Sequence, residues 1–282
     1  MKTYLDCYPC LLRQALSAAR RAGASEDQQH KILLDTMKEL SAFPSDAKPP
    51  QLAYRIHQRV QKLTNNIDPY REAKSQATKQ ALALYPELQK KASTSADPLE
   101  MAVRIAIAGN IIDLGVAESY DLAATLKRVL TQPLAINDLV HFRKALARCN
   151  SVLYLADNAG ETVFDRILIE TLDVPVTFVV KSGPIINDAT YEDAMAAGID
   201  QIAKIIDNGS NDPGTLLDQC SEIFRNSFAQ ADLIIAKGQA NYESLSGNSA
   251  PIFFLLQAKC SVIAQELNVA EGAIVLKRQA IN

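Results

Sequence analysis

Ser-Val-Leu-Tyr-Leu-Ala-Asp-Asn-Ala-Gly-Glu, residues 151–161, is the stretch that decides the fold of this chain. Residues 151–156 form a short apolar run with β-branched and aromatic side chains, as in a buried strand, and the run ends abruptly at Asp157. Residues 162–172 then repeat apolar side chains at helical spacing. A strand, a short polar turn and a helix make the βα unit of an α/β domain, in which ligands bind beyond the carboxyl ends of the strands.

The turn after this strand carries side chains that suit a metal ion. Asp157 and Asn158 supply hard oxygen ligands of the kind that magnesium, manganese or a similar divalent cation prefers. Gly160 would let the backbone approach a ligand closely. The alternative interpretation is that Asp157 merely caps the helix that follows.

Two later segments repeat this arrangement. The apolar runs at 175–180 and 231–236 each lead into a turn that contains a Lys, an Asn and a Gly. If the strands are parallel neighbours, all three turns lie at one edge of the sheet. Carboxylates such as Asp188 would then gather a metal ion, while Lys181 and Lys237 would meet an anion. This combination suits phosphoryl chemistry, which requires charge neutralisation and positioning.

The rest of the chain predicts two unlike halves. No comparable strand pattern precedes Ser151, and the first half reads as helices at 11–23, 28–40, 50–63, 70–88, 98–114, 122–130 and 139–147. Further strands are expected at 202–206, 251–256 and 273–277. The prediction is an α/β protein: a helical half, residues 1–147, packed on a three-layer α/β/α, Rossmann-like half with a mostly parallel sheet, residues 148–282.

Three segments resemble signatures of the metal-dependent damage-control phosphatases, a family long known as domain of unknown function 89: residues 157–161, 183–190 and 237–243. Residues 6–14 resemble the start of the family's microbial branch, which carries an N-terminal C-x-x-C, and residues 108–113 and 258–260 also match. The resemblance spans essentially the whole chain in order. Two departures are Ala240, where relatives usually have Gly, and Ser261, where many have Pro.

The resemblance implies a phosphatase that uses a divalent metal (Mn²⁺, Co²⁺, Ni²⁺ or Mg²⁺) to hydrolyse a small phosphomonoester: a sugar phosphate, a nucleotide or a cofactor-derived phosphate, with a role in metabolite damage control. It supports Asp157, Asn158 and Asp188 as metal ligands, while Lys237 would hold the phosphate and offset charge in the transition state. Side chains that would shape the site or orient substrate are Glu161, Lys181 and Asn241. The nucleophile is either a metal-activated water or Asp157 itself, which would form an aspartyl-phosphate.

Asn110 and Asp113 interrupt an otherwise apolar helix near Gly109. Polar groups in such a place must find partners. They either reach into the cleft, where Asn110 would help to bind substrate, or form a hydrogen bond between the two halves.

The Cys7-Tyr8-Pro9-Cys10 pair permits three interpretations. At a helix start the helix dipole lowers a thiol pKa, which favours a redox role, but the βαβ context of a thioredoxin-like motif is missing nearby. A zinc site would need further ligands such as Cys149, Cys220 or Cys260. The third interpretation is structural burial.

Composition excludes several classes of function. The 282 residues carry a formal net charge of −3 and no Trp, so nothing suggests nucleic-acid binding. The longest apolar runs are strand-sized and no signal-peptide pattern opens the chain, so we expect neither a membrane partner nor secretion. Five Cys without disulfide-rich spacing favour a reducing cytoplasm. The expected partner is a small phosphorylated metabolite, with oligomeric state, substrate and metal identity left open.

Two other functions compete with the phosphatase. One is an S-adenosylmethionine-dependent protein-carboxyl methyltransferase, which the lack of a G-x-G loop after residue 156 and the two lysines disfavour. The other is a non-catalytic metal- or nucleotide-binding module in which the C-x-x-C acts as a redox sensor.

Overall fold

The computed structural model describes residues 1–44, 46–111 and 122–280. Its α-helices are α1 (Cys7–Arg21), α2 (Glu26–Ala42), α3 (Pro49–Thr64), α4 (Arg71–Ser93), α5 (Pro98–Ile111), α6 (Leu122–Thr131), α7 (Leu139–Leu146), α8 (Thr162–Ile169), α9 (Tyr191–Ala196), α10 (Glu222–Ala229), α11 (Gly238–Leu245) and α12 (Ser261–Leu267). Its strands are β1 (Leu134–Asn137), β2 (Val152–Leu155), β3 (Val176–Val180), β4 (Lys204–Asp207), β5 (Ile234–Lys237), β6 (Ile252–Gln257) and β7 (Ile274–Arg278).

The strands form one sheet in the order β1-β7-β6-β5-β2-β3-β4. All neighbouring pairs are parallel except β6 and β7, which are antiparallel. The expectation that the strands ending before Asp157, Lys181 and Lys237 are parallel neighbours is therefore confirmed. The strand order reverses between β2 and β5, which is where doubly wound sheets place their ligands.

The prediction that no strand precedes Ser151 was wrong. β1 covers only four residues, alternates between buried and exposed side chains, and pairs with β7 at the edge of the sheet. Because an edge strand is covered on fewer sides than the central strands, it needs no continuous apolar run, which is the pattern that predicts a buried strand.

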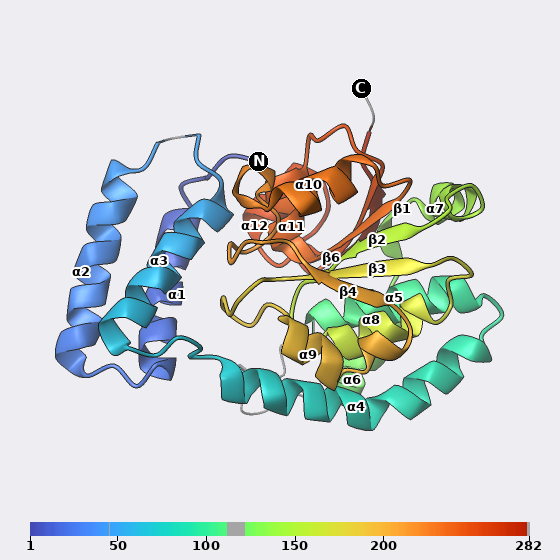
Figure 1. Cartoon of the computed structure of the whole chain (residues 1–282), viewed down its shortest axis with the longest axis horizontal. Coiled ribbons are helices and arrows are strands. Elements are labelled where there is room, and N and C mark those ends of the chain that lie inside the picture. The colour runs from blue at the N-terminus through green and yellow to red at the C-terminus, as the bar shows by residue number, and fades with distance from the viewer. Residues whose placement is uncertain (45, 112–121, 281–282) are drawn as a thin grey trace.

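Helices cover both faces of the sheet, which confirms the three-layer prediction. Tyr154 and Phe178 belong to the core under α4, α5 and α8, whereas Leu155 and Val179 belong to the core under α10, α11 and α12. Figure 1 shows these two helical layers on opposite sides of the sheet. Because successive side chains of a strand point to opposite faces of the sheet, each of these strands contributes to both cores.

Helices α1, α2 and α3 stand together to one side of the sheet (Figure 1) and have a hydrophobic cluster of their own. A hydrogen bond from Lys48 Nζ to the carbonyl of Ser244 (2.7 Å) ties the start of α3 to α11. The division expected at residue 148 stays a prediction. The hydrophobic clusters favour a division near residue 70 instead, because α4 already packs with the sheet.

Local sequence signals set the helix boundaries. Asp97 accepts a hydrogen bond from the Glu100 N–H (3.0 Å) and Pro98 opens α5, as the sequence predicts. The predicted extension of this helix to residue 114 lies outside the described residues. Within the described part of the chain, no helix is long and apolar enough to cross a membrane.

Candidate active site

A cleft of about 700 Å³ lies at the carboxyl ends of the strands, where the turns after β2, β3 and β6 and the start of α11 meet the ends of α1 and α3. From the sheet side it is lined by Asp157, Asn158, Asp188, Gln239, Ala240, Glu243 and Lys259, among others. From the helical side it is lined by Cys7, Cys10, Arg13, Gln14, Pro49, Pro50 and Ala53. The expected edge of the sheet is thus one wall of this open cleft.

Backbone hydrogen bonds hold the turns after β2 and β3 side by side. The Ala159 N–H donates to the carbonyl of Asn187 and the Ala189 N–H donates to the carbonyl of Asp157, both at 2.8 Å. Asn158 and Asp188 face each other in an isolated antiparallel bridge. Asp157, Asn158 and Asp188, which come from two turns, therefore share one wall of the cleft; with Lys259 we call them the cleft wall.

Asp157 is held in a single orientation. Its Oδ2 accepts hydrogen bonds from Asn110 Nδ2 (2.5 Å) and Asn158 Nδ2 (3.0 Å). Gly238 packs against it so closely that a Cβ built on Gly238 would lie 1.9 Å from Oδ2. Burial, and then the nearby Glu161 and Asp188, raise the pKa of Asp157 well above its ordinary value. The charges of Lys259 and Lys237 oppose this rise in the pKa but do not cancel it.

Asp188 also has unused hydrogen-bond acceptor capacity. It is buried, its Oδ2 has no hydrogen-bond partner among the described residues, and Lys181 Nζ lies 3.6 Å from that oxygen. Burial raises the pKa of Asp188 to about 6, against the opposing charge of Lys181.

The cleft wall fits a hard divalent cation in the chemistry of its donors: two buried carboxylates and an amide oxygen. No three His, Cys, Asp or Glu side chains converge as a metal-binding group in the described part of the chain. The expected set contains only two such side chains, and its third member, Asn158, is an amide.

Directly beneath the cleft wall lies a second polar set, Asn110, Glu161, Asp165 and Lys237, which we call the buried layer. Lys237 is fully buried and donates to Glu161 Oε1 (2.6 Å), to Asp165 Oδ1 and to the carbonyl of Ala106 (2.9 Å). Burial works to lower the Lys237 pKa, but Asp165 and Glu161 outweigh it and raise the pKa. All three ammonium hydrogens thus have acceptors within the protein.

This geometry bears on the role expected for Lys237. Lys237 is not among the residues that line the cleft, so its direct contact with phosphate stays a prediction. The contacts favour a role in fixing Glu161, whose Oε2 in turn accepts from Asn110 (2.9 Å) and Asn158 (3.1 Å). The expected substrate contact of Asn110 stays a prediction too. Asp113 lies outside the described residues.

Lys181 and Asn241 brace the turns around the cleft. Lys181 Nζ donates to the carbonyl of Gly214. Asn241 Nδ2 donates to the carbonyls of Ala156 (3.1 Å) and Lys237 (2.8 Å), and its Oδ1 accepts from Thr215 (2.7 Å). Their proposed roles in orienting substrate are untested, whereas their contacts order the 208–216 loop and the start of α11.

The sequence analysis gave no role to two charged residues of the site, although it placed one of them, Lys259, in a segment that matches the family. Lys259 is exposed, lines the cleft, and its charge opposes the rise in the Asp157 pKa. It follows a strand at the same edge as the other turns, so the strand-end argument applied to residues 251–256 would have found it. Asp165 lies on the buried face of α8, one helical turn after Glu161, and accepts from the Tyr154 hydroxyl (2.7 Å).

Helix α4 supports the turns from below. A Cβ on Gly160 would lie 2.8 Å from Ala77 Cβ, so this glycine admits α4 rather than a ligand, contrary to the expectation. Buried Lys74 pairs with Asp193 (2.9 Å), whose carboxylate also accepts from the Thr190 N–H (3.0 Å) and hydroxyl (2.7 Å). The turn that carries Asp188 is thereby anchored to α4.

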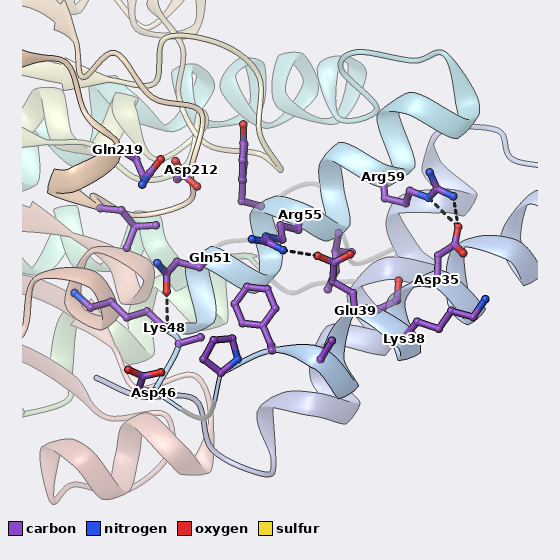
Figure 2. A pocket seen from close by; sticks show the side chains of 18 residues that line it. Asp35, Lys38, Glu39, Asp46, Lys48, Gln51, Arg55, Arg59, Asp212 and Gln219 are labelled. Carbon is purple, nitrogen blue, oxygen red and sulfur yellow. Dashed lines mark hydrogen bonds and ion pairs between the residues drawn. The ribbon is translucent and has the colours of Figure 1, made fainter.

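A second hollow, of about 1160 Å³, lies between α2, α3 and the 212–219 segment. Figure 2 shows both arginines of the hollow paired with carboxylates: Arg55 with Glu39 (2.9 Å) and Arg59 with Asp35 (2.8 Å). Because these arginines already have carboxylate partners, the hollow is a poorer place for an anion than the cleft.

A mostly parallel α/β sheet that gathers carboxylates, an amide and a lysine near its switch point has the groups that hydrolysis of a small phosphorylated molecule requires. The family model of the damage-control phosphatase ARMT1-like domain matches residues 3–275, and the chain belongs to this family. It is therefore a phosphatase of the damage-control type, and this family is generally metal-dependent.

Individual relatives agree with this assignment. A damage-control phosphatase of Pyrococcus horikoshii is 35% identical over 99% of this chain and 98% of its own length. One from Archaeoglobus fulgidus is 36% identical over 98% of this chain and 99% of its own. The crystal structure of a DUF89 family protein from Pyrococcus horikoshii superimposes with a TM-score of 0.92 at 35% identity, covering 99% of this chain and 100% of that chain.

Proposed function

We propose that the chain hydrolyses a small phosphomonoester in this cleft with a divalent cation held by Asp157, Asn158 and Asp188. The observation that carries the proposal is the convergence of these three side chains and Lys259 on one wall of a 700 Å³ cleft. A cleft of this size suits a sugar phosphate, a nucleotide or a cofactor-derived phosphate better than a macromolecule.

When bound, the cation would neutralise phosphate charge and lower the pKa of an attacking water. The protein's own contribution is positional. Asn110 and Asn158 fix Asp157 through its Oδ2. Lys237 fixes Glu161, which receives hydrogen bonds from the same two amides.

Phosphate would be held by Lys259 and by the N-terminus of α11. No side chain caps α11, so the N–H groups of its first turn lack the capping acceptor that Ser25 gives α2 and Ser221 gives α10. Gln239 and Ala240, in that first turn, line the cleft. Uncapped amides together with a helix dipole favour an anion.

Water is the proposed nucleophile, because Asp157 is already engaged by two amides and packed against Gly238. The alternative, attack by Asp157, would leave an acyl phosphate that borohydride reduces to an alcohol. Mass spectrometry of enzyme quenched with borohydride during turnover separates the routes: a modified Asp157 would contradict the proposal.

The proposal is tested by p-nitrophenyl phosphate hydrolysis with Mn²⁺, Co²⁺, Ni²⁺ or Mg²⁺, before and after EDTA. We expect turnover that EDTA abolishes and that added metal restores. Turnover that survives complete metal removal would contradict it. A panel of phosphorylated sugars, nucleotides and cofactor fragments, read as phosphate release, then identifies the substrate class.

A further inference from the structure

The first turn of α1 places two thiols at the mouth of the cleft, and the proposed hydrolysis uses neither. Cys7 is the first residue of α1 and is half-buried, while Cys10 is exposed. Both line the cleft across from the cleft wall.

Their spacing permits a disulfide. Residues three apart on a helix lie on one face, with Cα atoms about 5 Å apart from the helical rise and radius. This falls within the separation that disulfides adopt. Because Cys7 opens the helix, its side chain and backbone can adjust without breaking hydrogen bonds in the helix interior.

The surroundings favour Cys10 as the reactive thiol. The N-cap residue of α1 is Asp6, but its side chain caps no N–H group and the first turn holds no acidic residue, so the N–H groups of that turn and the helix dipole favour an anion there. Arg13 lies three residues after Cys10, on the same face, and lines the same cleft. Burial raises the pKa of Cys7, which makes it the poorer first nucleophile.

We propose that Cys7 and Cys10 form a redox-active dithiol that low-molecular-weight disulfides such as glutathione disulfide oxidise reversibly. The Cys10 thiolate attacks one sulfur of the oxidant, which releases one thiol and leaves a mixed disulfide on Cys10. The Cys7 thiolate then attacks Cys10 Sγ, which forms the Cys7–Cys10 bond and releases the second thiol. The protons of the two cysteines end on the two released thiols, and the oxidant takes up both electrons.

The other cysteines provide internal controls. Cys220 is buried and burial raises its pKa to about 11, so it should stay a thiol. Cys260 lies on the opposite side of the cleft, where Gln239 Nε2 approaches its Sγ at 3.6 Å. It is the thiol most able to compete for either member of the pair.

The test equilibrates the full chain with a series of glutathione to glutathione disulfide ratios, followed by acid quenching, alkylation and peptide mass spectrometry. We expect a Cys7–Cys10 disulfide that grows with the oxidised fraction and that dithiothreitol reverses. Cys7→Ser should leave Cys10 as a mixed disulfide, and Cys10→Ser should slow the reaction with the oxidant, because the remaining Cys7 thiol is half-buried. Cys220→Ser should change nothing.

Three outcomes would overturn the proposal: both thiols persist at every ratio, Cys260 is the partner in the disulfide, or the reduced chain binds Zn²⁺ through Cys7, Cys10 and Cys260. Because the readout is disulfide mass, it is independent of phosphate hydrolysis, and a chain without phosphatase activity would still give a decisive result.

Discussion

The cleft wall and the buried layer are stacked on each other, yet they satisfy their charges in opposite ways. In the buried layer, Lys237 donates to Glu161, Asp165 and a backbone carbonyl, so its ammonium group is satisfied without a ligand. Asp165 Oδ2 and Asn110 Oδ1 are buried without a hydrogen-bond partner among the described residues. In the cleft wall, Asp188 Oδ2 has no hydrogen bond among the described residues and only a long ion pair with Lys181 (3.6 Å), while Lys259 is exposed. The same residue types therefore have two roles. The buried layer fixes the geometry of the site, and the cleft wall remains open to metal and phosphate.

Of the substitutions in the cleft wall, Asp157→Asn should reduce turnover most. The change is nearly isosteric but removes a negative ligand, so turnover should fall by at least about a hundredfold, the scale of losing a major electrostatic contributor. Steady-state kinetics with p-nitrophenyl phosphate measures this, with exposed Asp200→Asn as the matched control. Undiminished turnover in Asp157→Asn would show that this carboxylate is not required for catalysis.

The two lysines test the comparison directly. Lys237→Met leaves Glu161 and Asp165 buried without a counter-charge and should lower the free energy of unfolding by about 3–5 kcal/mol. Lys259→Met should change that free energy by less than about 0.5 kcal/mol, yet reduce kcat/KM by about tenfold or more. Urea unfolding and steady-state kinetics on both variants provide the measurements. A loss of stability in Lys259→Met and a loss of turnover without a loss of stability in Lys237→Met would contradict the roles assigned to the two lysines.

Two glycines separate backbone strain from site geometry. Gly238 (φ +76°) and Gly247 (φ +87°) both adopt left-handed backbone, so the backbone strain of an Ala should cost about 1 kcal/mol of stability at either position. Only at Gly238 would the new Cβ strike Asp157; at Gly247 nothing lies within 4 Å. Because displacement of about 1 Å can cost a hundredfold in rate, Gly238→Ala should approach that loss while Gly247→Ala keeps wild-type turnover. Equal activities would show that Asp157 tolerates displacement.

The smallest effect is a pH dependence of metal-free stability. The pKa of Asp188 is raised to about 6 in the folded chain from an ordinary value of 3.8. Its contribution to stability is therefore complete below about pH 4 and is lost as the pH rises through 6. Between pH 5 and 7.5, wild type should lose about 1.4 kcal/mol relative to Asp188→Asn. Urea unfolding in EDTA measures this difference. If the free energy of unfolding depended on pH in the same way in both proteins, the raised pKa of Asp188 would be contradicted.

The sequence predicts the fold well where local pattern decides it. The apolar runs after residue 150 became strands within a few residues of their predicted ends, and the three polar turns lie on one edge because parallel strands end together. β1 was not predicted because four residues of alternating burial at the edge of a sheet have a sequence like that of a loop.

The candidate site was predictable in position but not in the burial of each charge. Lys237 and Lys259 follow neighbouring strands, and their sequences do not distinguish them. Helix α5 covers Lys237, as its contact with Ala106 shows, and that packing joins residues 131 apart in the chain. No local pattern records such a contact, so a lysine expected at the phosphate lies in the buried layer.

Anomalous diffraction from crystals of the chain equilibrated with Mn²⁺ tests the central claim most directly. The account predicts a manganese peak within bonding distance of carboxylate oxygens of Asp157 and Asp188 and of the Asn158 amide oxygen, with the buried layer unchanged beneath it. A peak elsewhere, for instance at the thiols of α1, or a cleft wall without manganese at saturating concentration, would contradict it.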